Sequence, residues 1–272
     1  MKRRQFLTTA CVAGLAAATM RTVTAAEPSG SPYFLDFRMI TFSNAQRLET
    51  YAKHNGEVVI PAINRHGISP VGLFVADSNL NSGERNYDEK YDNVLFGLTP
   101  HPTFDSTQEL AENMQGDAQY RESLAALSQG ATSRNPLFTA HEQVLLRCFP
   151  EFPGVKVPSL DPNRILQLRM YRSHSFERNR AKITQYVIEN GAIEVFLECG
   201  MRPVFFATTL FGAFMPSYFF MFSFESEEHI QDSWAKFRDH PNWHRLRDDP
   251  AYADTATEII SVLLRPVPGS QI

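Results

Sequence analysis

The sequence predicts an α+β fold in which two ferredoxin-like units pack sheet against sheet. Two observations lead to this prediction. Four short segments recur in the same order along the 272-residue chain, and both copies show the pattern strand, helix, strand, strand, helix, strand. The recurring pairs are 34–39 with 165–170, 66–71 with 199–204, 114–120 with 237–243, and 144–147 with 262–265. This spacing is too long for a solenoid repeat, so each copy is predicted to be a small domain.

The first unit is predicted over residues 33–148. Its expected elements are a strand at 34–40, a helix at 45–66, strands at 71–75 and 93–98, a helix from 106 to about 114, and a strand at 143–148. Ser106 and Glu109 have the spacing of a capping box. The polar loop 76–91 is too long for a simple hairpin and is typical of a lid or an interaction surface. Residues 118–140 are expected to be partly helical.

The second unit is predicted over residues 164–272, after a proline-rich linker at 149–163. Its expected elements are a strand at 165–171, a helix at 175–198, strands at 204–211 and 218–224, a helix at 226–238, a helical turn at 241–247 and a strand at 258–265. Asn55-Gly56 and Asn190-Gly191 recur inside the two long helices. Because glycine is a poor helix former, each pair predicts a local break or a close backbone approach.

The N-terminus has the pattern of an export signal. Residues 2–7 (KRRQFL) contain a twin-arginine pair, and a short apolar stretch and the small residues 24–26 follow. Residues 1–26 are therefore predicted to be a cleaved twin-arginine signal peptide. The mature protein is expected to be periplasmic or otherwise exported. The apolar stretch is too short for a stable anchor, so no membrane insertion is expected after cleavage.

Composition narrows the classes of partner. The formal charge is −4, and it becomes more negative once the basic signal is removed, which argues against a nucleic-acid-binding surface. Cys148 and Cys199 are predicted to be buried thiols. His240 and His244 are four residues apart, but Pro241 favours a helix cap over a metal site, so no metal is predicted. No cofactor motif occurs, and a homo-oligomer is compatible with the sequence.

Strand alternation assigns residues to the two faces of each sheet. The apolar faces, with Leu35, Phe37, Met39, Leu166, Leu168 and Met170, are predicted to meet the helices. The opposite faces are predicted to meet the other unit and to present arginines to an anion, with Phe205, Phe219 and Tyr171 as walls. The candidate ligand-binding residues are Arg38, Arg147, Arg169, Tyr171, Arg202 and Arg265. The alternative is that carboxylates such as Asp36 and Glu142, or backbone carbonyls, pair with these arginines.

Several segments of the second unit resemble the NIPSNAP family. They are 168–171 (LRMY), 200–206 (GMRPVFF), 215–216 with the Phe-rich strand after it, 237–243, and 262–266 (VLLRP). The resemblance is strong over 164–272 and weaker over 33–148. It implies a tandem version of the dimeric α+β barrel superfamily, which includes antibiotic-type monooxygenases, haem-degrading enzymes and chlorite dismutases. It implies no catalytic residues.

Three functions remain open. The first is binding of a small, anionic molecule between the two sheets. The second is a non-catalytic interaction or scaffold role through loop 76–91. The third is a cofactor-independent oxygenase or isomerase, for which the sequence offers no assignable general base. A filled barrel would favour the interaction role, and an open cavity would favour ligand binding.

Overall fold

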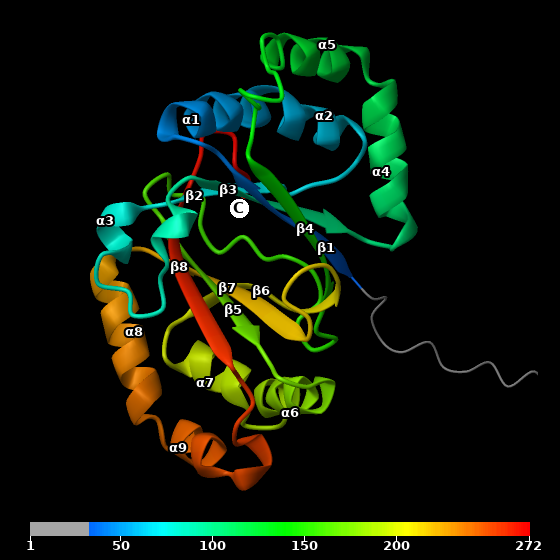
Figure 1. Cartoon of the computed structure of the whole chain (residues 1–272). Helices are drawn as coiled ribbons and strands as arrows, with labels where there is room; N and C mark the ends of the chain where they lie inside the picture. Colours follow the sequence, from blue (N-terminus) through cyan, green and yellow to red (C-terminus); the bar gives the residue numbers. More distant parts are fainter. Residues whose placement is uncertain (1–32) are drawn as a thin grey trace, which may run out of the picture. The chain divides into compact units, whose positions relative to one another are not determined.

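Eight strands close into one barrel in the computed structural model, which describes residues 33–272 (Figure 1). The first half of the chain supplies β1 (Phe34–Thr41), β2 (Gly72–Ala76), β3 (Val94–His101) and β4 (Ala140–Cys148). The second half supplies β5 (Ile165–Arg172), β6 (Arg202–Phe211), β7 (Ser217–Phe224) and β8 (Glu258–Pro266). The predicted signal peptide lies outside the described residues.

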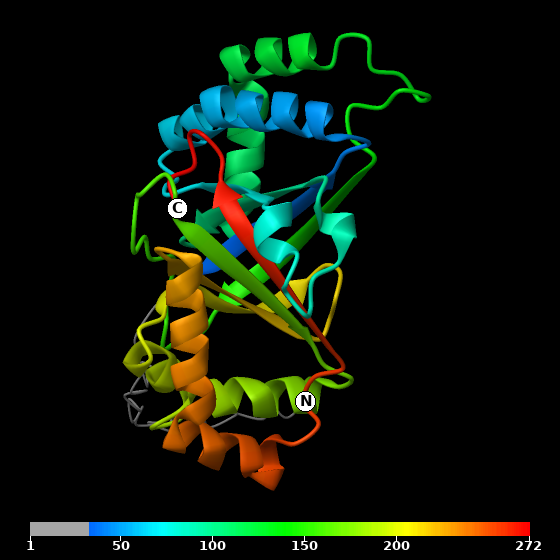
Figure 2. The same cartoon turned by 90° about the vertical axis from the view of Figure 1, so that its left-hand side faces the viewer.

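The two halves join at two antiparallel strand pairs. The order around the barrel is β1-β3-β2-β8-β5-β7-β6-β4, and β4 pairs with β1 to close it. The pairs β2–β8 and β4–β6 connect the sheet of one half to the sheet of the other. The prediction of two βαββαβ units packed sheet to sheet within one chain is therefore confirmed. Figure 2 shows β8 and β5 running side by side.

Helices cover the outside of each half. The first half carries α1 (Ala45–His54), a π-helical turn η1 (Asn55–Val59), α2 (Ile60–Arg65), α3 (Ser78–Asn81), η2 (Glu89–Tyr91), α4 (Asp105–Gly116) and α5 (Ala118–Leu127). The second half carries α6 (Phe176–Val187), α7 (Ala192–Glu198), α8 (Glu227–Asp239), α9 (Pro241–Asp248) and η3 (Pro250–Tyr252). Among the described residues, no helix has the length and apolar character needed to span a bilayer.

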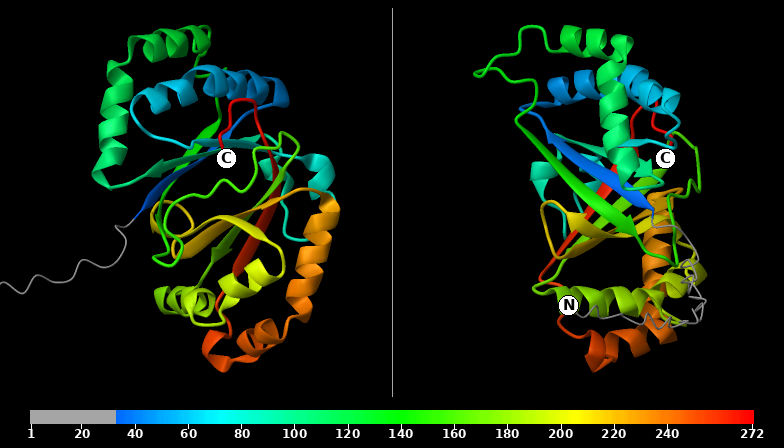
Figure 3. Two further views of the ribbon diagram at one scale, coloured as in Figure 1. Left: turned by 180° about the vertical axis from the view of Figure 1, so that it is seen from behind. Right: turned by 90° about the vertical axis from the view of Figure 1, so that its right-hand side faces the viewer.

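The two glycine positions interrupt their helices as predicted. Gly56 lies in the π-helical turn η1, where a Cβ atom would come within 2.1 Å of the Pro268 carbonyl oxygen. The C-terminal segment therefore packs directly on this helix, and Figure 3 shows the C-terminus beside the helices of the first half. In the second half, Gly191 precedes α7, and the long predicted helix is divided into α6 and α7.

Helix ends agree with the sequence in two cases and differ in one. Ser226 caps α8 by accepting a hydrogen bond from the His229 amide (3.1 Å), and His240 caps α9 through its Nδ1. The capping box predicted at Ser106 is wrong. Helix α4 begins one residue earlier, and the Ser106 amide donates to the Thr103 hydroxyl (3.2 Å).

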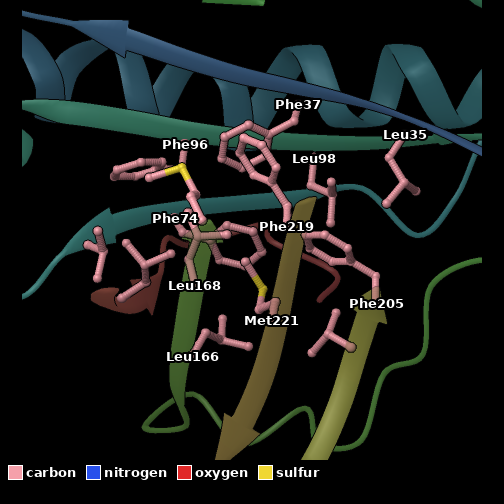
Figure 4. Close-up of a cluster of buried hydrophobic side chains, with 14 of the residues drawn as sticks. Leu35, Phe37, Phe74, Phe96, Leu98, Leu166, Leu168, Phe205, Phe219 and Met221 are labelled. Atoms are coloured by element: carbon pink, nitrogen blue, oxygen red, sulfur yellow. The ribbon is translucent and has the colours of Figure 1, made fainter. Parts of the chain in front are cut away.

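The interior of the barrel is filled by apolar side chains from both halves (Figure 4). Leu35 and Phe37 of β1 face Leu168 of β5 and Phe219 of β7 across it, and all four are inaccessible to solvent. The predicted assignment of the strand faces is therefore wrong. The apolar faces meet each other, and the faces with Arg38 and Arg169 lie toward the helices.

The physical reason is the difference between the two environments. Eight strands seal the barrel interior, where an arginine would be buried without water or a counter-charge. The space between a sheet and its helices has open margins and polar helix side chains, so a guanidinium can find partners there. The all-apolar faces therefore pack against each other. Cys148 and Cys199 are both buried and unpaired, as predicted.

Loop 76–91 folds back onto the second half. The Asn81 side chain, which is 2% exposed, accepts a hydrogen bond from the Leu263 amide (2.8 Å) and donates to the Leu263 carbonyl (2.7 Å). The Ser261 amide donates to the Asn86 carbonyl (3.0 Å). Asn81 thus forms with the backbone of β8 the pair of hydrogen bonds that a neighbouring strand would form. The loop from the first half lies along the edge of the second half (Figure 1).

Candidate functional site

A cavity of about 610 Å³ lies between the outer face of the second sheet and its helices. Strands β5 and β8 form its floor, and α6, α7, α8 and α9 form its walls. Six aromatic side chains line it, namely Tyr171, Tyr186, Phe196, Trp234, Phe237 and Trp243. Its charged residues are Arg169, Lys182, Arg238 and Glu84. Glu84 comes from loop 76–91, so the first half of the chain contributes to a cavity of the second half.

Arg169 projects from β5 into this cavity without a counter-ion. One terminal nitrogen of its guanidinium donates to the Tyr171 hydroxyl (3.0 Å), and its central carbon lies 4.7 Å from the centre of the Trp234 ring. Its Nε is buried and has no hydrogen-bond partner. Among residues 33–272, no carboxylate forms a salt bridge with Arg169. A half-buried guanidinium whose buried Nε has no acceptor is costly unless an anion approaches it.

Lys182 on α6 is the second cation of the cavity. Its Nζ donates to the Gln185 Oε1 (2.7 Å) and lies 5.6 Å from the centre of the Trp243 ring and 5.8 Å from that of Tyr186. It forms no salt bridge within the described part of the chain. Burial, reinforced by the positive charge of Arg169, lowers the pKa of Lys182 to about 8.

The first half contains an equivalent arginine whose charge is balanced by a carboxylate of the same strand. Arg38 holds the place on β1 that Arg169 holds on β5, and Asp36 lies two residues before it. Both Nε and Nη2 of Arg38 donate to one Asp36 oxygen, at 3.0 and 2.6 Å. The corresponding cavity, lined by Arg38, has a volume of only about 90 Å³.

Gln167 replaces this carboxylate in the second half. It lies two residues before Arg169, but its amide is used elsewhere. Its Oε1 accepts from the Trp234 indole nitrogen (2.8 Å), and its Nε2 donates to the Ser261 hydroxyl (3.1 Å). The arginine without a carboxylate on its own strand is the one that faces the larger cavity.

The six predicted ligand-binding residues do not form one cluster. Only Arg169 and Tyr171 share the cavity. Arg38 pairs in register with Gln143, whereas Arg147 pairs with Phe34 at the other end of β1, so these two arginines are not neighbours. The predicted anion site between the sheets, through Arg169 and Arg265, is therefore wrong, because neither side chain points into the barrel.

The remaining candidates lie at the surface. Arg147 is exposed, and Arg202 forms a salt bridge with Glu225 (2.7 Å). Arg265 forms a salt bridge with Asp77 of the first half (3.1 Å). These carboxylate partners agree with the alternative reading, in which acids pair with the arginines. In residues 33–272, no group of three or more His, Cys, Asp or Glu side chains is arranged to bind a metal.

Sequence reasoning missed Lys182, Gln185 and the roles of Trp234 and Trp243. Both tryptophans pack against the buried cluster of the second half and also line the cavity. One feature of the sequence could have identified Lys182. Lys182 precedes Tyr186 by four residues on a helix, so a basic side chain lies on the face that packs against the sheet.

Comparison with known proteins agrees with this architecture. The model of the NIPSNAP family matches residues 166–271. The second half is similar to NIPSNAP. The match begins at β5 and ends near the C-terminus, so it includes most of the residues that line the cavity. No curated protein matches the chain.

Solved structures share the fold at low sequence identity. A protein of Lactobacillus acidophilus NCFM, provisionally named a monooxygenase, is 12% identical, with a TM-score of 0.50 over 87% of this chain and 94% of that one. A similarly named protein of Fusobacterium nucleatum subsp. nucleatum ATCC 25586 is 9% identical, with a TM-score of 0.53 over 88% and 93%. An anthrone oxidase-like protein is 8% identical, with a TM-score of 0.51 over 88% and 95%. The chain therefore has the dimeric α+β barrel fold.

Proposed function

We propose that this protein binds a small aromatic anion in the cavity between the second sheet and its helices. The observation that carries the proposal is the contrast between two arginines. Arg38 has a carboxylate two residues before it on its own strand, and Arg169 has an amide there. The proposal thus keeps the predicted anion but moves it from the barrel interior to the outer face of the second sheet.

Electrostatics favours an anion at Arg169. A guanidinium that is partly removed from water loses hydration, and a carboxylate restores that loss through two parallel hydrogen bonds. Lys182 and Arg238 add positive charge around the same cavity, against the single carboxylate of Glu84. An incoming anion would therefore meet a net positive environment.

The aromatic walls favour a planar ligand. Tyr171, Trp234 and Trp243 offer ring faces and edges, which pack best against another flat ring. A volume of about 610 Å³ is within the range of small-molecule sites, roughly 300–1,000 Å³. A benzoate- or naphthoate-like molecule would suit both the charge and the shape.

The filled barrel interior favours the interaction role over a ligand site between the sheets, but the cavity outside the second sheet provides a different place for a ligand. Loop 76–91 packs against β8 of its own chain through Asn81, which leaves less of it for a separate protein partner. A monooxygenase reaction is the second candidate, because two proteins of this fold are provisionally named monooxygenases and the cavity is open to a ligand. At such low identity those names supply only an idea to test, and the described residues supply no group assigned to oxygen chemistry.

Tryptophan fluorescence provides a direct test. Trp234 and Trp243 are the two tryptophans of the chain, and both line the cavity, so intrinsic emission reports on this site. Titration with 2-naphthoate should change the emission saturably. Arg169→Ala should weaken binding by about 10- to 100-fold, the loss expected for one charged hydrogen-bonding group.

The matched control is Arg202→Ala. Arg202 lies at the start of β6 in the same half, and its salt bridge with Glu225 is on the surface. This variant should bind 2-naphthoate as the wild type does. Equal binding by the Arg169→Ala variant, or no saturable change with any aromatic carboxylate, would refute the proposed function.

A further inference from the structure

We propose that Lys182 is a general base that removes a proton from a carbon atom of an aromatic 2-oxo acid held by Arg169. This inference rests on the proposed function, because it assumes that the anion is bound in the same cavity. It supplies the proton acceptor that the sequence alone did not reveal. The reaction it predicts is keto–enol tautomerisation of the bound acid.

The amine of Lys182 is held in place by a short chain of hydrogen bonds. The Nζ donates to the Oε1 of Gln185 (2.7 Å), and the Nε2 of Gln185 donates to the Leu246 carbonyl (2.6 Å). The second bond fixes the orientation of the amide, so that its oxygen faces Lys182. Gln185 is 1% exposed and is therefore a buried positioning residue.

The surroundings of Lys182 make its neutral form accessible near neutral pH. The charged groups that share the cavity are Arg169, Arg238 and Glu84, and the amine has the rings of Tyr186 and Trp243 beside it. No carboxylate pairs with it among the described residues. With a pKa of about 8, a useful fraction of Lys182 is unprotonated near neutral pH, as a general base requires.

The two cations suit different parts of one ligand. A 2-oxo acid carries a carboxylate oxygen and a keto oxygen side by side, and the fork of the Arg169 guanidinium can donate to both. The aromatic ring would pack among the cavity's aromatic side chains. The carbon next to the keto group would then be free to face the Lys182 amine.

The proton transfer balances without another reagent. The Lys182 amine takes the proton from the carbon, and the C–H electron pair forms a carbon–carbon double bond. The π pair of the keto group moves to its oxygen, and this enolate is stabilised by Arg169. The ammonium then returns a proton to that oxygen, which gives the enol. The positive charge gained by Lys182 is matched at each moment by the negative charge on the ligand.

Deuterium exchange into phenylpyruvate tests this step. The full-length protein is incubated with phenylpyruvate in deuterated buffer, and loss of the proton signal at C3 is followed by NMR. The wild type should accelerate exchange well above the buffer rate, and the rate should rise with pH through about 8. Lys182→Arg keeps the charge but cannot act as a base at this pH, so its rate should fall by about 100-fold or more.

Two controls separate a chemical role from a structural one. Lys182→Arg should still quench tryptophan fluorescence with 2-naphthoate, which cannot enolise. Lys236→Met, which removes an exposed lysine of α8, should exchange phenylpyruvate at the wild-type rate.

The outcomes distinguish this inference from the proposed function. If 2-naphthoate binds but phenylpyruvate does not exchange, the general base is refuted and the anion site stands. The same holds if Lys182→Arg exchanges as fast as the wild type. If neither compound binds, both proposals fail.

Discussion

Phe37 of β1 and Phe219 of β7 touch across the barrel interior, with their ring centroids 5.5 Å apart. One residue belongs to the first half of the chain and the other to the second, and neither is accessible to solvent. The two sheets therefore share a single core, in which side chains of one half complete the packing of the other. The stability of each half depends on the presence of its neighbour.

Phe219→Ala should destabilise the whole described unit. Removal of a buried phenylalanine ring leaves a cavity and typically costs about 3–5 kcal/mol of unfolding free energy. Denaturant unfolding followed by circular dichroism measures this loss. Phe211→Ala is the control, since that ring is 63% exposed and should cost little. Similar losses for the two variants would contradict the shared core.

Gln167→Asp should abolish binding of aromatic carboxylates. The variant recreates in the second half the pairing of Asp36 with Arg38, so that Arg169 gains an internal carboxylate and no longer needs an external one. We expect 2-naphthoate affinity to fall by at least about tenfold, as for the loss of a charged contact. Gln167→Asn is the matched control. This variant shortens the side chain by as much as Gln167→Asp does but adds no charge, so it should retain most of the affinity for 2-naphthoate. A Gln167→Asp variant that binds as well as the Asn variant would argue against an anion at Arg169.

Asn81→Ala should release loop 76–91 from the second half. The substitution leaves the Leu263 amide, which now donates to Asn81, without its partner in a buried position, at a cost of about 1–3 kcal/mol. Limited proteolysis should then cleave the loop faster, and Glu84 should no longer be held at the cavity. Asn79→Ala, at an exposed position of the same short helix, should not change the cleavage rate. Unchanged cleavage in the Asn81 variant would show that the loop is held by other contacts.

Acid should destabilise the first half through His101, which is buried, and His54, which is half-buried. Burial lowers the pKa of His54 and His101 below the ordinary value of 6.5, and Arg38 adds to this at His101 while Asp36 opposes it. The unfolded chain therefore binds more protons than the folded one in this range. Above pH 6.5, these two histidines should leave the unfolding free energy constant. As the pH falls from 6.5 toward their lower pKa values in the folded protein, the unfolding free energy should decrease.

Denaturant titrations at a series of pH values measure this slope. His101→Gln should make it shallower, because His101 is 1% exposed and its Nδ1 lies 3.0 Å from the Ser106 hydroxyl, where an amide can also bond. His174→Gln, at an exposed histidine, should leave the slope as it is. If the His101 variant keeps the full pH dependence, other groups must cause it.

We also propose that the protein is exported through the twin-arginine pathway. Replacement of both Arg3 and Arg4 by lysine keeps the charge of residues 2–7 but removes the pair that the export receptor reads. Precursor should then accumulate in the cytoplasm, as cell fractionation and mass determination would show. Wild-type amounts of mature protein outside the inner membrane would contradict this assignment.

The element order was readable from the sequence because it depends on local patterns. Period-two alternation marked the strands, and the Asn-Gly pairs marked the interruptions of the long helices. The face of each strand that enters the barrel was not readable in this way. Residues such as Phe37 and Tyr171 are apolar or aromatic on opposite faces of their sheets, so hydrophobicity alone could not decide which face would be sealed.

The site was only partly predictable for a similar reason. Arg169 and Tyr171 were found because they lie on one strand, two residues apart. Lys182, Trp234 and Trp243 come from three helices whose packing on the sheet is a tertiary property. Glu84 comes from the other half of the chain, through a loop that Asn81, Asn86 and Asp77 hold against β8.

On the proposed function, the small first-half cavity around Arg38 and Asp36 predicts one bound ligand for each chain. A barrel built from two identical chains would present two equivalent sites, and ligands could bind them with mutual influence. Here one arginine is permanently satisfied by its own strand, so each chain should take up a single ligand along a simple hyperbolic isotherm. The first half then serves as a structural support for the second half. A substitution of Asp36 should be tolerated only if another group balances the charge of Arg38.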